Sequence, residues 1–131
     1  MNLILARSKY IQDHKAQLND ISDPHTAILL VMQELNKNLR KITDAKNRST
    51  NLRAAFTNAF TAVYILQTSL DFARGGEIAE NLFRLYEYCR QQLLKAFARK
   101  QDHNLETCVV LLDEIIQAWE GIGQDQGSRS A

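Results

Sequence analysis

The most regular part of the chain is residues 52–70, with the sequence LRAAFTNAFTAVYILQTSL. Apolar side chains recur there at alternating intervals of four and three residues, which places them on one face of an α-helix. We predict a helix over about residues 50–73. Gly75 and Gly76 are expected to end it, because glycine readily takes the left-handed conformation that closes a helix. The apolar face consists of Leu52, Phe56, Ala59, Val63, Leu66 and Leu70.

Three other segments, at about residues 24–43, 77–98 and 104–122, have a similar apolar spacing. The first begins with Asp23 and Pro24, an acceptor side chain followed by proline, which is a typical helix start. The connections between the four segments are short, as in bundles whose consecutive helices run in opposite directions. The sequence therefore predicts an all-α fold, an antiparallel up-down-up-down four-helix bundle.

The bundle is predicted to span residues 23–123 as a single domain, since a chain of 131 residues is too short for two stable cores. Residues 1–22 are weakly patterned, and we expect a loosely structured N-terminal segment there. The tail, residues 124–131, is polar and small in its side chains and is expected to be disordered.

Charge and hydropathy exclude several classes of protein. The 16 Lys and Arg residues against 15 Asp and Glu give a net charge of +1, which provides no general field for binding nucleic acid. The longest uninterrupted apolar run, residues 27–32, is far shorter than the roughly 20 residues that cross a bilayer. The first residues lack the charged start of a signal peptide. We therefore expect a cytoplasmic protein without membrane insertion, in which Cys89 and Cys108 stay reduced.

The sequence contains none of the motifs that indicate an enzyme. It has no glycine-rich phosphate loop, no nucleophile elbow and no paired-cysteine metal motif. His14, His25 and His103 lie in three separate segments, and the Glu-x-x-His motif of di-iron bundles is absent. We predict no catalysis, no cofactor and no metal. Cys89 and Cys108 lie on the core faces of their helices and are expected to be small, buried hydrophobic side chains.

Two of the predicted helices carry more large apolar side chains than one core-facing stripe needs. A wide stripe is typical of a helix that simply faces a core. It is also typical of an exposed groove that binds another helix, and the pattern alone leaves both explanations open. The additional side chains are Phe60, Tyr64, Ile65 and Phe72 in the second helix and Phe83, Tyr86, Leu94 and Phe97 in the third.

A run of residues in the middle of the chain is more specific. It comprises Ser69-Leu70-Asp71, Gly75-Gly76-Glu77, Ala79, Asn81-Leu82, Leu85-Tyr86 and Tyr88. This run resembles the central signature of the bacterial flagellar secretion chaperones, the FliS family. Further motifs of that family are matched by Tyr10 with Gln12, Pro24 with His25, and Ala118 with Trp119. The chain departs from the family pattern at Met32, Glu34 and Phe97, residues that would alter the shape of a partner groove.

The resemblance implies a cytoplasmic export chaperone that binds the disordered C-terminal segment of flagellin. Such a chaperone prevents premature polymerisation and delivers flagellin to the flagellar export apparatus, without a cofactor. Export-gate and regulatory proteins are further partners that the resemblance implies. The implied partner-binding residues are Tyr10, as a lid or edge contact in the N-terminal segment, and the groove walls Leu82, Leu85 and Tyr86, with Phe83 beside them. Tyr86 is expected to be exposed.

The alternative is a self-associating or regulatory helical-bundle protein. The same apolar face would then close against a second copy and form a homodimer. In either case Leu82 and Leu85 are also candidates for core residues, because both have the spacing of the core-facing stripe.

Overall fold

The computed structural model describes residues 23–44 and 52–129, and every regular element within these residues is an α-helix. The helices are α2 (Pro24–Thr43), α3 (Leu52–Thr68), α4 (Phe72–Phe97) and α5 (Leu105–Arg129). The N-terminal segment, residues 1–22, lies outside the described residues. The expectation that it is loosely structured therefore stays a prediction.

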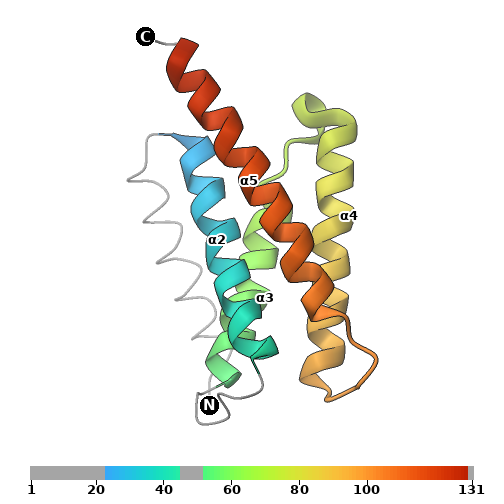
Figure 1. The fold of residues 1–131 in the computed structure, drawn as a ribbon. Coiled ribbons are helices and arrows are strands. Elements are labelled where there is room, and N and C mark those ends of the chain that lie inside the picture. The colour runs from blue at the N-terminus through green and yellow to red at the C-terminus, as the bar shows by residue number, and fades with distance from the viewer. Residues whose placement is uncertain (1–22, 45–51, 130–131) are drawn as a thin grey trace.

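The four helices alternate in direction around the bundle. In the view of Figure 1, α2 runs downward, α3 upward, α4 downward and α5 upward. α2 packs against α3 and α5, and α4 packs against the same two helices. Each helix therefore has two neighbours, and the predicted all-α, up-down-up-down four-helix bundle is confirmed.

The core is formed by the apolar stripes that the sequence spacing identifies. Leu35, Val63 and Leu112 have no exposed surface. Burying a side chain of this size contributes about 1.5–3 kcal/mol, so the stripes are the main source of stability. Cys89 and Cys108 are free thiols that are fully buried in the same cluster, as predicted.

Polar contacts join α2 to α5. Trp119 Nε1 donates a hydrogen bond to the His25 carbonyl at 3.0 Å, and His25 Nε2 donates to the Trp119 carbonyl at 2.6 Å. The two rings are stacked with their centroids 5.0 Å apart. Further along the interface, Asn36 and Arg40 both donate to the Asp113 carboxylate. These contacts fix the register of α2 against α5, because a shift of either helix would leave the polar groups unpaired.

The predicted boundary between the second and third helices is wrong. α3 ends at Thr68, not near residue 73, and α4 begins at Phe72, ahead of the two glycines. The Asp71 carboxylate accepts a hydrogen bond from the backbone N–H of Arg74 at 3.0 Å. This N-cap satisfies a donor that would otherwise be unpaired at the start of a helix, so α4 starts here.

Gly76 interrupts α4 instead of ending α3. Its backbone has φ 50° and ψ −124°, a conformation that side-chain-bearing residues adopt only under strain. The kink separates a short first turn, capped by Asp71, from the long segment that ends at Phe97. The glycine is therefore used for its conformational freedom, as predicted, but within a helix.

α5 is longer than predicted. Its helical backbone continues past the expected end at residue 122 to Arg129, and Gly121 does not stop it. Glycine in a helix interior costs about 1 kcal/mol relative to alanine, which a long helix tolerates. The helical backbone thus enters the segment 124–131, whose expected disorder stays a prediction.

Gly76→Ala is expected to destabilise the protein by about 1–3 kcal/mol, because alanine is strained at a positive φ with this ψ. Urea unfolding followed by circular dichroism measures the change. Gly121→Ala is the control: Gly121 is helical, and nothing lies within 4 Å of the position that its Cβ would take. This variant should be neutral or more stable by up to about 1 kcal/mol. Equal stability of Gly76→Ala and the wild type would contradict the positive φ of residue 76 at the kink.

Candidate functional site

A hollow of about 680 Å³ lies at the end of the bundle where α2 begins and α3 gives way to α4. We call it the end hollow. The stacked rings of His25 and Trp119 contribute to its wall, together with the kinked start of α4 at Gly75. Its apolar lining consists of Pro24, Ile28, Leu66, Leu70, Ile78, Ala79, Leu82, Tyr86, Trp119 and Ile122.

A second hollow, of about 410 Å³, lies between α3 and α4 and is called the α3–α4 groove. The Phe97 ring meets the rings of Phe56 and Phe60 edge-on, with centroids 5.4 and 6.5 Å apart. Phe97 is nevertheless 57% exposed, so its ring is open to solvent on its other side. The groove is lined by Thr57, Phe60, Tyr64 and Gln67 from α3 and by Arg90, Leu94 and Phe97 from α4.

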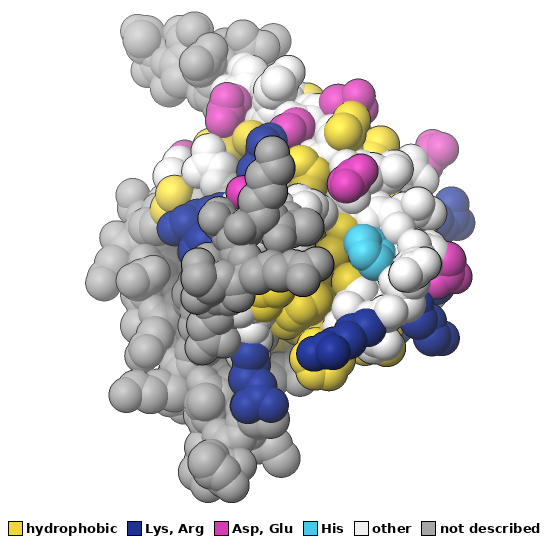
Figure 2. Space-filling model, turned by 60° about the horizontal axis from the view of Figure 1, so that its bottom comes forward, with side chains coloured by type: hydrophobic (Ala, Val, Ile, Leu, Met, Phe, Trp, Pro, Cys, Tyr) yellow, Lys and Arg dark blue, Asp and Glu magenta, His cyan; other side chains and the backbone are white. Residues whose placement is uncertain are grey.

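The outer surface of α4 exposes large apolar side chains. Ile78 is 69% exposed, and the rings of Phe72 and Phe83 lie 6.0 Å apart on the surface. Figure 2 shows hydrophobic side chains gathered at the end of the bundle where α4 ends, with charged side chains around them. Exposed apolar side chains that gather in this way are typical of a protein-binding site. The exposed large side chains of α4 are Phe72, Ile78, Phe83, Leu94 and Phe97.

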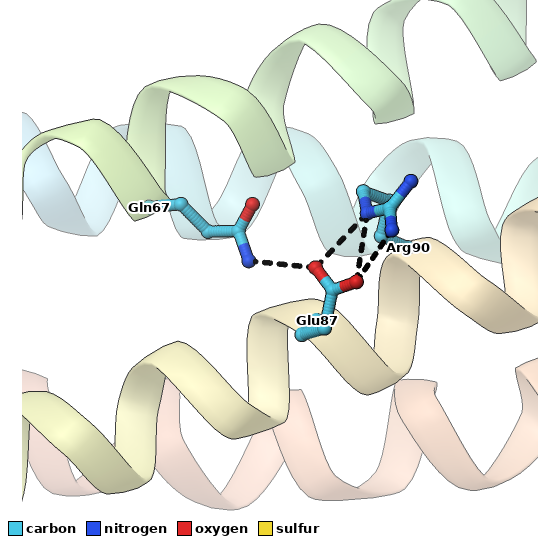
Figure 3. Close-up of polar contacts among 3 residues, drawn as sticks. All are labelled: Gln67, Glu87 and Arg90. Carbon is cyan, nitrogen blue, oxygen red and sulfur yellow. Dashed lines mark hydrogen bonds and ion pairs between the residues drawn. The ribbon is translucent and has the colours of Figure 1, made fainter.

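A polar cluster of Gln67, Glu87 and Arg90 joins α3 to α4 (Figure 3), and its Gln67 and Arg90 are part of the wall of the α3–α4 groove. Arg90 Nε donates to the two carboxylate oxygens of Glu87 at 3.1 and 2.9 Å, and Arg90 Nη2 donates as well. Gln67 Nε2, from α3, donates to Glu87 Oε2 at 3.1 Å. These hydrogen bonds lower the pKa of Glu87 to about 2, and those from Arg90 have a larger effect than the one from Gln67. The Glu87 carboxylate in turn raises the pKa of Arg90.

Two of the predicted partner-binding residues, Leu82 and Tyr86, come together in the end hollow. Tyr86 is only 1% exposed, and its burial raises its pKa to about 12. The expectation that Tyr86 is exposed is therefore wrong. Tyr86 lies on the inner face of α4, and its ring is part of the main hydrophobic cluster.

The other predicted residues lie in different places. Phe83 is 39% exposed on the outer surface of α4. Leu85 is half-buried and packs against the core cluster, as does Leu82. Tyr10 lies outside the described residues. The structure thus brings together two of the five and places Phe83 on a separate, outward-facing surface.

The sequence contained a signal for the apolar part of the α3–α4 groove. Phe60, Tyr64 and Leu94 stand beside the core stripes in the pattern, but they were not assigned to partner binding. Arg90 resembled one of many dispersed basic residues, and Gln67 had no distinguishing feature. Their association depends on the packing of α3 against α4, which spacing within one helix does not specify.

No candidate metal centre is found within residues 23–44 and 52–129. No group of three or more His, Cys, Asp or Glu side chains is placed to hold a metal ion there. None of these helices combines the length and apolar character that a membrane crossing needs. A hydrogen bond with Cys108, together with burial, raises the pKa of Cys89, which makes this thiol a poor nucleophile.

Comparison with known proteins identifies the family. The family described as "Flagellar protein FliS" matches residues 6–126. The chain belongs to this family. The "Flagellar secretion chaperone FliSB" of Pseudomonas aeruginosa is 34% identical over 110 residues, which cover 82% of this chain and 86% of that protein. The "Flagellar secretion chaperone FliS" of Salmonella typhimurium is 42% identical over 57 residues, which cover 44% of this chain and 42% of that protein.

The resemblance seen in the middle of the chain is thereby confirmed. Both FliS relatives are named as chaperones and not as enzymes, in agreement with the prediction that the chain is not an enzyme. No solved structure matches it.

Glu87→Gln is expected to remove an acid-sensitive part of the stability. The pKa of Glu87 is lowered from 4.5 to about 2 in the folded protein, so its contribution is present above about pH 4.5 and is lost as the pH falls toward 2. In urea unfolding, the stability difference between wild type and Glu87→Gln should therefore shrink over that range. Glu114→Gln, which removes an exposed carboxylate of α5, is the control. The same pH dependence of stability in both variants would contradict the lowered pKa of Glu87 in this cluster.

Proposed function

We propose that this protein is a cytoplasmic export chaperone that binds the disordered C-terminal segment of flagellin. It keeps that segment from polymerising prematurely and delivers flagellin to the flagellar export apparatus. The observation that carries the proposal is the exposed apolar surface of α4 in a member of the FliS family. The names of the two relatives, both flagellar secretion chaperones, support export as the process.

The surface suits an amphipathic helix. α4 has 26 residues and, at about 1.5 Å per residue, is about 39 Å long, so several turns of a partner helix fit beside it. The α3–α4 groove offers the edge-on rings of Phe60 and Phe97, with Leu94 exposed beside them. A segment that is disordered alone folds as its apolar face enters such a groove. Coupled folding of this kind buries roughly 1,000–3,000 Å².

Occupation of the groove explains how binding prevents polymerisation. The apolar face of the flagellin segment is covered by the chaperone, so it is not available to other flagellin copies. Binding relies on apolar burial and requires no nucleotide, metal or other cofactor. Transfer to an export-gate protein then requires only that a competing contact displaces the segment.

The N-terminal segment, residues 1–22, is proposed as a lid over part of this surface in the free chaperone, with Tyr10 as a contact residue. The described chain begins at Asp23, and Pro24 lines the end hollow, so the preceding segment joins the bundle beside that hollow. Leu82 and Tyr86 lie in the wall of the hollow and are proposed to support the lid or the partner there.

Calorimetric titration with the C-terminal segment of flagellin from the same organism tests the proposal. We expect stoichiometric binding with a negative heat-capacity change and a gain of helical circular dichroism. Leu94→Ala, which truncates a 46% exposed side chain of the groove, should weaken binding about 5–30-fold. Val110→Ala is the control, because Val110 is 56% exposed on α5 and lines neither hollow. This variant should bind like the wild type.

Failure of the wild type to bind the flagellin segment would contradict the proposal. Concentration-dependent light scattering would then test the alternative, in which the surface of α4 closes against a second copy of the chain. Tyr86→Ala is not a suitable binding variant. Tyr86 is buried, so its truncation would leave a cavity in the core.

A further inference from the structure

The apolar surface of α4 is interrupted by charge. Phe83, Glu87, Arg90, Leu94 and Phe97 follow one another at intervals of four and three residues and share one outer face of the helix. Glu87 and Arg90 therefore lie between apolar side chains on both sides. A helix docked along this face has to cover the polar cluster as well as its apolar neighbours.

The hydrogen-bonding capacity of the cluster is only partly used (Figure 3). Both oxygens of Glu87 accept hydrogen bonds, from Nε and Nη2 of Arg90 and from Nε2 of Gln67. Two groups have no partner among the residues that the structure describes, namely Nη1 of Arg90, a donor, and Oε1 of Gln67, an acceptor. The Arg90 side chain is 43% exposed and that of Glu87 29%, so solvent reaches the cluster in the free protein.

A docked helix would exclude this solvent and would have to replace its hydrogen bonds. Glu87 and Arg90 neutralise each other, so an additional charged side chain would be buried there without a counter-charge. The amide of Asn or Gln is uncharged and has an acceptor oxygen beside a donor NH₂. Its oxygen can accept from Nη1 of Arg90 while its nitrogen donates to Oε1 of Gln67.

We propose that the Gln67–Glu87–Arg90 cluster selects a docked helix whose apolar face is interrupted by one Asn or Gln, and that this contact fixes the register of the helix along α4. The inference rests on the proposed function, because the helix is taken from the C-terminal segment of flagellin. Phe83 lies one turn before Glu87, and Leu94 lies one turn after Arg90. A docked helix that slips by one turn would place an apolar side chain over the cluster and leave its two free groups unpaired.

Calorimetry on the full chain tests the inference, with synthetic flagellin C-terminal segments as the probe. Each Asn and Gln of the segment is replaced in turn by the acid of the same shape, Asn by Asp and Gln by Glu. We expect one position at which the acid weakens binding to the wild type by about tenfold or more, because a charge is added to a neutral cluster. At the other positions the change should be less than about threefold.

Protein variants then show whether the cluster is responsible. Gln67→Met removes the acceptor and keeps the size of the side chain. In this variant, the loss of affinity caused by the acid at the sensitive position of the segment should change by at least about threefold. Arg90→Lys, which keeps the charge and loses the planar guanidinium, should change the same loss of affinity. Gln117→Met makes the matched substitution at an exposed site on α5 that lines neither hollow, and should retain the full loss of affinity.

The outcomes separate the two proposals. Binding of the parent segment without any position that is coupled to Gln67 or Arg90 would overturn the inference and leave the chaperone function standing. Coupling that appears equally in Gln117→Met would overturn it as well. Failure of the wild type to bind the parent segment would overturn the proposed function, and the inference with it.

Discussion

α4 carries apolar side chains on two faces, and its neighbours in the bundle cover only one of them. Tyr86, Cys89 and Leu93 face inward and are fully buried or nearly so. Phe83 and Phe97 lie on the outer face and keep a large part of their surface in water. Among the described residues, the helices that pack against α4 are α3 and α5, and they lie on its inner side. Exposed apolar area of this kind drives association with a partner.

The rest of the fold holds this surface in place. The reciprocal hydrogen bonds of His25 and Trp119 and the shared carboxylate of Asp113 align α2 with α5, and these helices form the side of the bundle away from the α3–α4 groove. The Asp71 cap and the Gly76 kink set where α4 starts relative to α3. The α3–α4 groove is therefore held in place by contacts outside it. In the proposed complex, its polar cluster would provide the directional contacts that apolar burial lacks.

Periodicity was sufficient to predict the bundle, because the core-facing stripe of each helix is recorded in the spacing of its own residues. The predicted boundary between the second and third helices was at Gly75 and Gly76, because the prediction used the glycines as the end signal. It did not consider that the Asp71 side chain could cap the next helix. The expected exposure of Tyr86 was wrong, because one helical pattern does not specify how far a ring is buried by its neighbours. The contact of Gln67 with Glu87 joins two helices and could not be predicted from either alone.

The most direct test of the central claim is fluorine NMR of the chain labelled at its five phenylalanines, with and without the flagellin C-terminal segment. We expect the signals of Phe83 and Phe97 to shift and to lose their sensitivity to solvent on binding, because the bound helix would cover the outer face of α4. The signal of Phe56, which is buried, should change least. Binding that leaves the signals of Phe83 and Phe97 unchanged would contradict the assignment of this surface to the partner.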